Sequence, residues 1–318
     1  MTIVERAILS MSDKTAILCM LLATFGFAIQ DTVVKILSTN GSLWQLMLLR
    51  AFLVLIILLL WFKTLGRQSS IIPIGWFWPI LRGVFMSFAY TLFYASLPFV
   101  SLSEAATCFF TAPIFVCIFS VFFLRETIGW RRFSAVIVGF IGVALIIQPR
   151  ADMVNFILIL PLLAGLSYAS AVIITRGFCK DQPSLSLTFS HNVFYACLGL
   201  LMVSVLPMLP VSEGIRGSNS FFFIGWVSLT REILLLIGIT SVTHIIAMTA
   251  TIRAYQTAET SYVAPLEYFY LVFASIIDFF VWKVVLGFPV MIGIILVIIS
   301  GAFISVREGT KKNSKKLQ

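Results

Sequence analysis

The chain has 318 residues, of which 60% are hydrophobic and 11% charged, and its formal net charge is +9. Soluble domains are about 45–50% apolar and about 25% charged, so this composition excludes a water-soluble fold. It also excludes intrinsic disorder, because a chain with 30 Phe cannot stay solvated.

Ten apolar stretches, separated by charged or turn-rich breaks, predict ten membrane-spanning helices. In chain order they cover residues 15–37, 43–62, 78–97, 105–124, 133–148, 155–175, 187–206, 233–254, 262–281 and 289–306. The first stretch is longer than a signal peptide core and has no small-residue cleavage site, which indicates a retained helix. The fold class expected is therefore an all-α polytopic membrane protein.

The distribution of basic residues predicts the orientation of these spans. With residues 1–14 in the cytoplasm, fourteen Lys and Arg fall on the cytoplasmic side and four in outer loops. The four outer residues are Arg150, Arg216, Arg231 and Lys283. This bias predicts both termini in the cytoplasm, with residues 307–318 as a basic tail resting against anionic lipid. The net charge is largely a topological signal, so no nucleic-acid partner is expected.

The chain also repeats its own organisation. Residues 15–148 and residues 155–306 each contain five predicted spans. Each half ends with a short polar loop, an apolar helix, a tight break and a Gly-containing helix. Because five is odd, the halves cross the bilayer in opposite senses, which predicts two inverted five-helix repeats, an architecture typical of secondary transporters.

Several short motifs, in this order and spacing, carry a family resemblance. They are Leu48-Leu49-Arg50-Ala51, Phe93-Tyr94-Ala95 through Pro113-Ile114-Phe115, Leu124-Arg125-Glu126 with Gly139-Phe140-Ile141-Gly142, and Arg253-Ala254-Tyr255 through Val263-Ala264-Pro265. Over residues 15–306 the chain resembles the drug/metabolite transporter superfamily, in its ten-helix branch with two EamA-like repeats. One departure is Trp282-Lys283, where such repeats often carry a glutamate like Glu126.

The resemblance implies a transporter of small organic metabolites, in a family that includes amino-acid exporters and carriers of S-adenosylmethionine and riboflavin. We therefore predict transport of an amino acid or an amino-acid-derived solute across the inner membrane, with the two halves exposing one central site to each side in turn. Proton coupling is an option, and no cofactor is expected. The alternatives are a membrane-embedded enzyme, a channel, or a non-transporting scaffold or sensor.

The motifs expected of a membrane enzyme are absent from the sequence. It has no HExxH, no GxGD and no Ser/His/Asp set at one membrane depth. Its five cysteines form no CxxC and no Cys/His cluster, so no metal site is expected.

Ionisable residues within spans cost about 2.5–3.5 kcal/mol each on insertion scales, so each needs a reason. Asp31 and Lys35 share a helix face at i, i+4 spacing. Either Gln30 and Asp31 belong to a substrate or proton site, or Asp31 and Lys35 neutralise each other. Arg50 is either an ion-pair partner of Asp31 or a substrate contact.

Glu267 and His244 are the other ionisable candidates. Glu267 follows Pro265, which removes a backbone donor and weakens the helix there. It is expected either to hold a substrate amine or a transported proton, or to pair with Arg253 or with a basic residue of another helix. His244 titrates in a range that suits proton coupling, but a neighbouring hydroxyl or carbonyl is the alternative partner.

Aromatic and hydroxyl side chains complete the candidates. Tyr90 and Tyr94 share a helix face, and Tyr168 lies well inside its span, so each suits either cation–π contact or core packing. Tyr270 follows Glu267, and Thr111 precedes the Pro113 break. A further ionisable residue, Arg82, is expected to be an interfacial anchor.

Overall fold

The structure is a computed structural model that describes residues 3–37, 41–65, 72–96, 105, 108–127, 129–147, 156–210, 214, 220–283 and 287–300. Within these ranges the side chains of residues 3–13, Leu65, Tyr94, Arg131, Arg132, Ile147 and Asp278 are left undescribed. The regular elements in the described part of the chain are all helices, and it contains no strand. The predicted tail, residues 307–318, lies outside the described residues.

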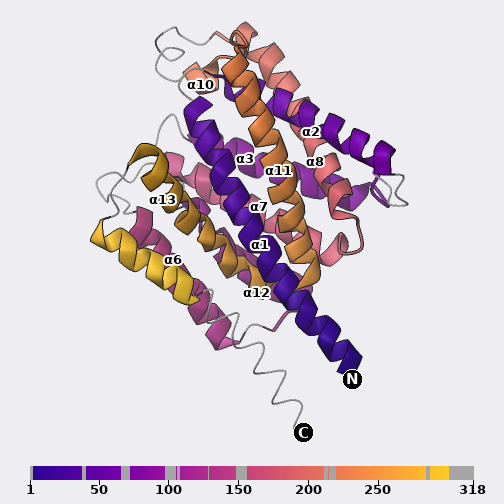
Figure 1. Ribbon diagram of the computed structural model, residues 1–318, viewed down its shortest axis with the longest axis vertical. Helices are drawn as coiled ribbons and strands as arrows, with labels where there is room; N and C mark the ends of the chain where they lie inside the picture. Colours follow the sequence, from indigo (N-terminus) through magenta and orange to yellow (C-terminus); the bar gives the residue numbers. More distant parts are fainter. Residues whose placement is uncertain are drawn as a thin grey trace.

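The helices follow one another along the chain with short connections (Figure 1). The first five elements are α1 (Ile3–Leu37), α2 (Leu43–Leu65), α3 (Phe77–Ser96), α5 (Ala112–Leu124) and α6 (Trp130–Ile147). Then come η1 (Phe156–Leu158), α7 (Ile159–Phe178), α8 (Ser184–Val205), η2 (Leu206–Met208), α10 (Ser220–Phe223) and α11 (Arg231–Thr257). The remaining elements are α12 (Thr260–Val263), η3 (Ala264–Tyr268), α13 (Phe269–Trp282) and a last helix, Phe288–Ser300.

All ten predicted spans correspond to apolar helices in the described residues. Six are long and apolar enough to cross a membrane, and four shorter apolar helices are Phe77–Phe93, Ala112–Leu124, Phe133–Ile146 and Phe288–Ser300. The chain is thus an all-helical polytopic membrane protein, as predicted. Large apolar side chains such as Phe122 and Leu235 remain exposed, as the surface of a lipid-embedded bundle requires.

Two predicted spans differ from continuous helices, each at a proline. The fourth span turns at Phe110 and Thr111, and α5 begins at Ala112 with Pro113 in its first turn. The ninth span changes from α12 to the 3-10 turn η3 at Pro265 before α13 begins. Proline fits a first helical turn because it has no N–H to donate, so these helices restart there.

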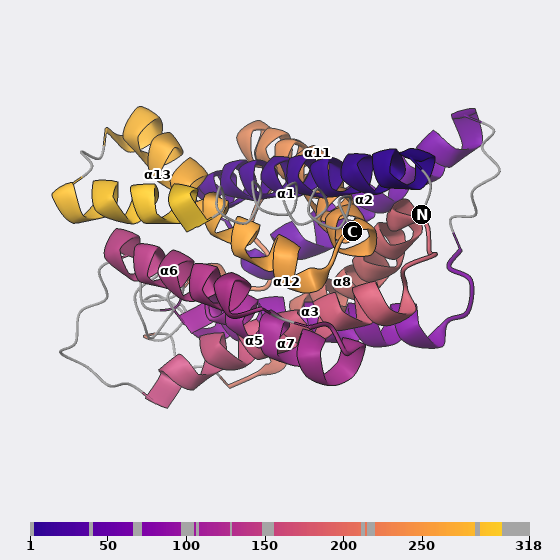
Figure 2. The same ribbon diagram turned by 90° about the horizontal axis from the view of Figure 1, so that it is seen from below.

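The helices form two layers (Figure 2). The first layer contains α1, which packs against α11 and α13, together with α2, which packs against α11. The second layer contains α7, which packs against α3 and α5, together with α8, which packs against α3. Contacts between α2 and α8 join the layers. Each layer therefore combines helices from both predicted halves of the chain.

The packing in one half of the chain has counterparts in the other. The pairing of α1 with α11 corresponds to that of α7 with α3. Likewise α13 lies on α1, and α5 lies on α7. Arg125, after α5, and Lys283, after α13, both adopt left-handed backbone conformations, with φ values of 54° and 55°. Both helices thus end in the same turn.

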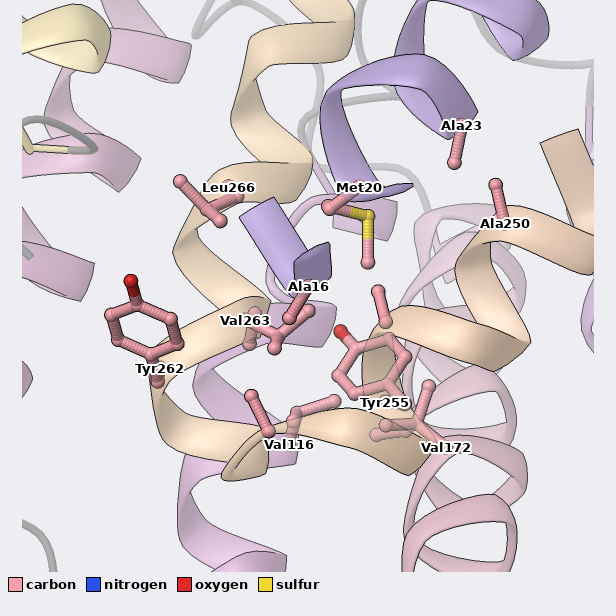
Figure 3. Close-up of a cluster of buried hydrophobic side chains, with 14 of the residues drawn as sticks. Ala16, Met20, Ala23, Val116, Val172, Ala250, Tyr255, Tyr262, Val263 and Leu266 are labelled. Atoms are coloured by element: carbon pink, nitrogen blue, oxygen red, sulfur yellow. The ribbon is translucent and has the colours of Figure 1, made fainter. Parts of the chain in front are cut away.

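A buried cluster lies where the layers meet, shown in Figure 3. Tyr255 of α11 lies there among Met20 of α1, Val172 of α7 and Leu266 of η3. Its members are mostly small or flexible side chains, which allow helices to approach closely in a membrane. This cluster packs against η3 and so helps to position Glu267, the residue that follows Leu266.

Candidate functional site

Polar and ionisable side chains gather in the interior, although the protein is apolar outside. Those at most 8% exposed include Gln30 0%, Arg50 2%, Arg82 1%, His191 0%, His244 0% and Glu267 8%. Ionisable groups at membrane depth are costly, and where they occur they face the bundle interior and mark substrate or ion pathways.

Glu267 of η3 lies at the junction of the layers. Its Oε1 atom accepts hydrogen bonds from the Tyr168 hydroxyl, at 2.6 Å, and from the Tyr255 hydroxyl, at 2.5 Å. The bond from Tyr168 crosses from α7 to the opposite layer, and the bond from Tyr255 comes from α11. The expected alternative, a pair with Arg253, is wrong: Arg253 is exposed, and Glu267 is held by neutral hydroxyl groups.

Two further pairs join α1 to the second half of the chain. The Gln30 side-chain oxygen lies 3.1 Å from His244 Nδ1, so a neighbouring carbonyl group, one of the partners expected for His244, contacts this ring. The Tyr270 hydroxyl donates to Asp31 Oδ2 at 2.7 Å. The predicted neutralising pair of Asp31 with Lys35 is therefore wrong. Lys35 instead lies over the Trp282 ring, with its Nζ 4.0 Å from the ring centroid.

Arg50 packs on an aromatic group between α3 and α8. Its guanidinium carbon is 5.1 Å from the centroid of the Tyr195 ring, a cation–π geometry. The Tyr90 ring meets Tyr195 edge-on at 5.5 Å and lies 6.2 Å from the His191 ring. The predicted ion pair between Arg50 and Asp31 is not formed among the described residues, although the two lie within electrostatic range.

The remaining predicted residues differ in outcome. The Thr111 hydroxyl donates to the Cys108 carbonyl at 2.5 Å, so it stabilises its own turn and does not reach the central groups. The side chain of Tyr94 lies outside the described residues. Arg82 is 1% exposed, so the expectation of an interfacial anchor is wrong. It points into the bundle, where Thr175 accepts a hydrogen bond from its Nε at 2.8 Å.

Sequence reasoning missed a network at the end of the bundle where α7 ends and α12 begins. Glu126 accepts hydrogen bonds from Thr260 N at 3.2 Å, Thr260 Oγ1 at 3.1 Å and Ser261 N at 3.4 Å. Its Oε1 also lies 3.7 Å from Arg176 Nε. Arg176 in turn donates to the Gln256 carbonyl at 3.0 Å. The network ties α5 and α7 to α11 and α12, and Glu126 caps α12 as an anion at a helix N-terminus.

The signal for this network was present in the sequence, as a Ser/Thr-containing loop after α11 and a lone acid after α5. Tyr255, the second donor to Glu267, had no such signal, because a tyrosine near the end of an apolar helix resembles any interfacial tyrosine. As for metals, the described residues contain no group of three or more His, Cys, Asp or Glu able to hold an ion.

Buried polar pairs between two layers of apolar helices are the arrangement expected of a membrane transporter. Comparison with known proteins agrees. The model of the EamA-like transporter family matches residues 14–148. The chain is 26% identical over 297 residues to an S-adenosylmethionine uptake transporter of Rickettsia bellii, covering 93% of this chain and 95% of that protein.

A riboflavin transporter of Vibrio cholerae is 28% identical over 303 residues, covering 94% of this chain and 95% of that protein. One crystal structure matches with a TM-score of 0.70 at 15% identity, covering 93% of this chain and 95% of that chain, a likeness of fold. Residues 14–148 thus match the EamA-like transporter family, within the drug/metabolite transporter superfamily, and more than nine tenths of the chain is similar to transporters. It is a multi-pass membrane transporter and not an enzyme.

Proposed function

We propose that this protein is a secondary transporter that moves a small organic metabolite, an amino acid or an amino-acid-derived solute such as S-adenosylmethionine, across the inner membrane. The observation that carries the proposal is the 2.6 Å hydrogen bond between Tyr168 and Glu267, which joins the two layers deep in the bundle. An ionisable contact between packed units is a site that both a substrate and a conformational change can use.

The moving units in this proposal are the two layers, each of which combines helices from both predicted halves, and not the two halves themselves. The chain is taken as two inverted five-helix repeats, residues 15–148 and 155–306. The paired contacts of α1 with α11 and α7 with α3 support this division, as do the matching turns at Arg125 and Lys283. Inverted repeats are related by an approximate two-fold axis in the membrane plane. Layers related in this way can open at either end with equivalent motions, which is the requirement of alternating access.

In this mechanism Glu267 receives the substrate amine or a proton. Because its Oε1 already accepts two hydroxyl hydrogen bonds, an arriving ammonium group replaces or joins donors that are in place. Loss of the Tyr168 bond then frees α7 from η3. His244, bonded to Gln30 within the first layer, is the second candidate for a proton carrier.

The orientation follows from the charge distribution. Both termini are placed in the cytoplasm, because the basic residues concentrate at the ends of the bundle where α2, α5 and α7 finish. The network of Glu126, Arg176 and Gln256 then lies at the cytoplasmic end. Relatives from Rickettsia bellii and Vibrio cholerae, both described as transporters, support a bacterial inner membrane.

The test is counterflow with purified protein in liposomes. Vesicles are loaded with one unlabelled solute and diluted into the same labelled solute, using S-adenosylmethionine, methionine and riboflavin in turn. Accumulation above protein-free vesicles for at least one solute supports the proposal. A broad metabolite screen in which no solute accumulates would contradict it, and would favour a scaffold or sensor.

A further inference from the structure

Arg82 lies inside the bundle and has no counter-ion in the part of the chain that the structure describes. It is in the second turn of α3, and 1% of its surface is exposed. Its Nε donates to the Thr175 hydroxyl at 2.8 Å, and its Nη2 lies 3.7 Å from the Met248 sulfur. Both partners are neutral. Among the described residues no carboxylate forms an ion pair with Arg82, and its buried Nη1 has no hydrogen-bond partner.

Burying a guanidinium group without an opposite charge is energetically unfavourable. Burying one charge costs several kcal/mol even after relaxation, and the cost is recovered only when an opposite charge and hydrogen bonds satisfy the group. An arginine is always protonated, so it cannot escape the cost by losing its proton. The open donor on Nη1 therefore points to an anion that is supplied from outside the chain.

His191 of α8 is the second polar side chain of this kind. Its surface is 0% exposed, and neither ring nitrogen has a hydrogen-bond partner in the described part of the protein. The ring lies within electrostatic range of both Arg82 and Arg50. Each of these two ring nitrogens can donate in one tautomer. Neither Arg82 nor Arg50 has an acidic ion-pair partner among the described residues.

The surroundings suit a small organic anion. Tyr90 lies within electrostatic range of Arg82 and of Arg50, so all four side chains form one neighbourhood. Arg82 belongs to the second layer and Arg50 to the first, so these four side chains lie between the proposed moving units. Tyr168 lies within electrostatic range of both Arg82 and Glu267, so the group adjoins the carboxylate at the layer junction.

We propose that Arg82, with His191, binds an anionic group of the transported substrate, a carboxylate or a phosphate, while Arg50 contributes attraction from the opposite layer. The inference rests on the proposed transport function and narrows it to solutes that carry such a group. Arginine suits this role because its planar fork matches the geometry of both carboxylate and phosphate.

The experiment uses two matched pairs of probes with purified full-length protein. S-adenosylmethionine is compared with its decarboxylated form, and riboflavin 5′-phosphate with riboflavin, so that the pairs separate a carboxylate source from a phosphate source. Binding is read as the rise in melting temperature at constant ionic strength, which requires no transport. Counterflow competition is read in parallel.

The anionic member of at least one pair is expected to bind about tenfold or more tightly than its partner, the size of one charge-assisted contact. Arg82→Gln is expected to abolish this preference, and Arg82→Lys to weaken it. His191→Leu removes no side-chain hydrogen bond seen among the described residues, so it is expected to fold and to reduce the preference. Exposed Arg253→Gln is the control.

Equal binding of both members of each pair by the wild type would overturn the anion site. So would a preference that survives in Arg82→Gln, or in His191→Leu if the Arg82 variants do not fold. A charge preference in the binding assay without any counterflow would contradict the transport function alone. Counterflow of riboflavin in preference to its phosphate would contradict the anion site alone.

Discussion

The Tyr168 hydroxyl donates a 2.6 Å hydrogen bond to the Glu267 carboxylate and so connects α7 with η3 across the two layers. The Tyr255 hydroxyl, donating at 2.5 Å to the same oxygen, comes from α11, which lies in the same layer as α13, the helix that continues η3. In the proposed mechanism the bond from Tyr168 opens when the layers part, and the bond from Tyr255 is kept. The mechanism thus expects Tyr168 to take part in the conformational change and Tyr255 to hold the carboxylate in position.

The first prediction concerns proton coupling at Glu267. An amide cannot bind a transported proton, so Glu267→Gln is expected to transport with a rate that no longer depends on pH. Tyr168→Phe keeps the carboxyl group and is expected to keep the pH dependence. It loses a hydrogen bond to a charged group worth about 1.5–3 kcal/mol, so it should transport less efficiently.

The measurement is labelled-solute uptake by vesicles over the pH range in which carboxyl and imidazole groups titrate. His244→Gln distinguishes the second candidate carrier. A pH profile in Glu267→Gln identical to that of the wild type would remove Glu267 from proton coupling.

The second prediction concerns the network around Glu126. Its carboxylate caps α12 through Thr260 and Ser261, so Glu126→Ala is expected to cost about 0.5–2 kcal/mol and to loosen this end of the bundle. Cys179, just after α7, reports on the opening because it is buried. Burial raises the pKa of its thiol to about 11, with Arg82 opposing the shift, so little reactive thiolate is present at neutral pH.

Maleimide labelling of Cys179, in a chain whose other four cysteines are replaced by serine, measures this opening. Labelling is expected to be several-fold faster in Glu126→Ala. The matched control is Glu259→Ala, because Glu259 is the N-cap residue of α12 but makes no side-chain capping hydrogen bond. Equal labelling rates in the two variants would show that Glu126 does not hold this end closed.

Sequence patterns predicted the helices well because hydropathy reports directly on lipid exposure. The ends of α2, α3 and α8 fall within a few residues of the expected positions. Both interruptions occur at prolines, but the sequence alone did not indicate that Pro113 would begin a helix at Ala112 and leave a turn before it. That outcome depends on how the preceding residues pack, which a single-helix pattern does not contain.

The site was predictable residue by residue but not pair by pair. Glu267, Tyr168, Gln30 and His244 were all candidates, because polar groups at membrane depth need a reason. Their partners come from helices distant in the sequence, so spacing within one helix favoured local pairs that do not form, such as Asp31 with Lys35. Arg82 was assigned to the interface for a different reason. Hydropathy gives the depth of a residue in the membrane only to within a turn or two of helix.

The third prediction concerns the contact between α6 and the last helix, Phe288–Ser300. A Cβ atom at Gly293 would lie 2.6 Å from the Gly142 carbonyl oxygen and 3.0 Å from the Ile146 nitrogen. Both are backbone atoms and cannot give way cheaply. Gly293→Ala is therefore expected to destabilise the protein by about 1–3 kcal/mol, the usual cost of overpacking.

Gly238→Ala is the control for this substitution. A Cβ atom there meets nothing within 4 Å, and alanine favours a helix over glycine by about 1 kcal/mol. Melting temperatures in detergent are expected to fall for Gly293→Ala and to hold or rise for Gly238→Ala. The same change in both variants would argue against close packing of these two helices.

The central claim, that transport requires the two layers to move against each other, is tested by disulfides between and within layers. A Cβ atom at Gly199 of α8 would lie 3.1 Å from Leu48 Cβ of α2, across the layers. One at Gly26 of α1 would lie 3.0 Å from Ala247 Cβ of α11, within one layer. Both separations are below the about 3.5–4.5 Å of a disulfide. At Gly199 the Cβ atom would also lie 2.9 Å from Leu48 N, so α2 and α8 must move apart by a few tenths of an ångström for that bond to form.

Counterflow is measured for Leu48→Cys/Gly199→Cys and for Gly26→Cys/Ala247→Cys, in a background without the native cysteines and with a solute that the wild type moves. We expect the disulfide between layers to stop counterflow and reductant to restore it, while the disulfide within a layer leaves counterflow intact. Undiminished counterflow with the Leu48–Gly199 positions fully cross-linked would contradict the account.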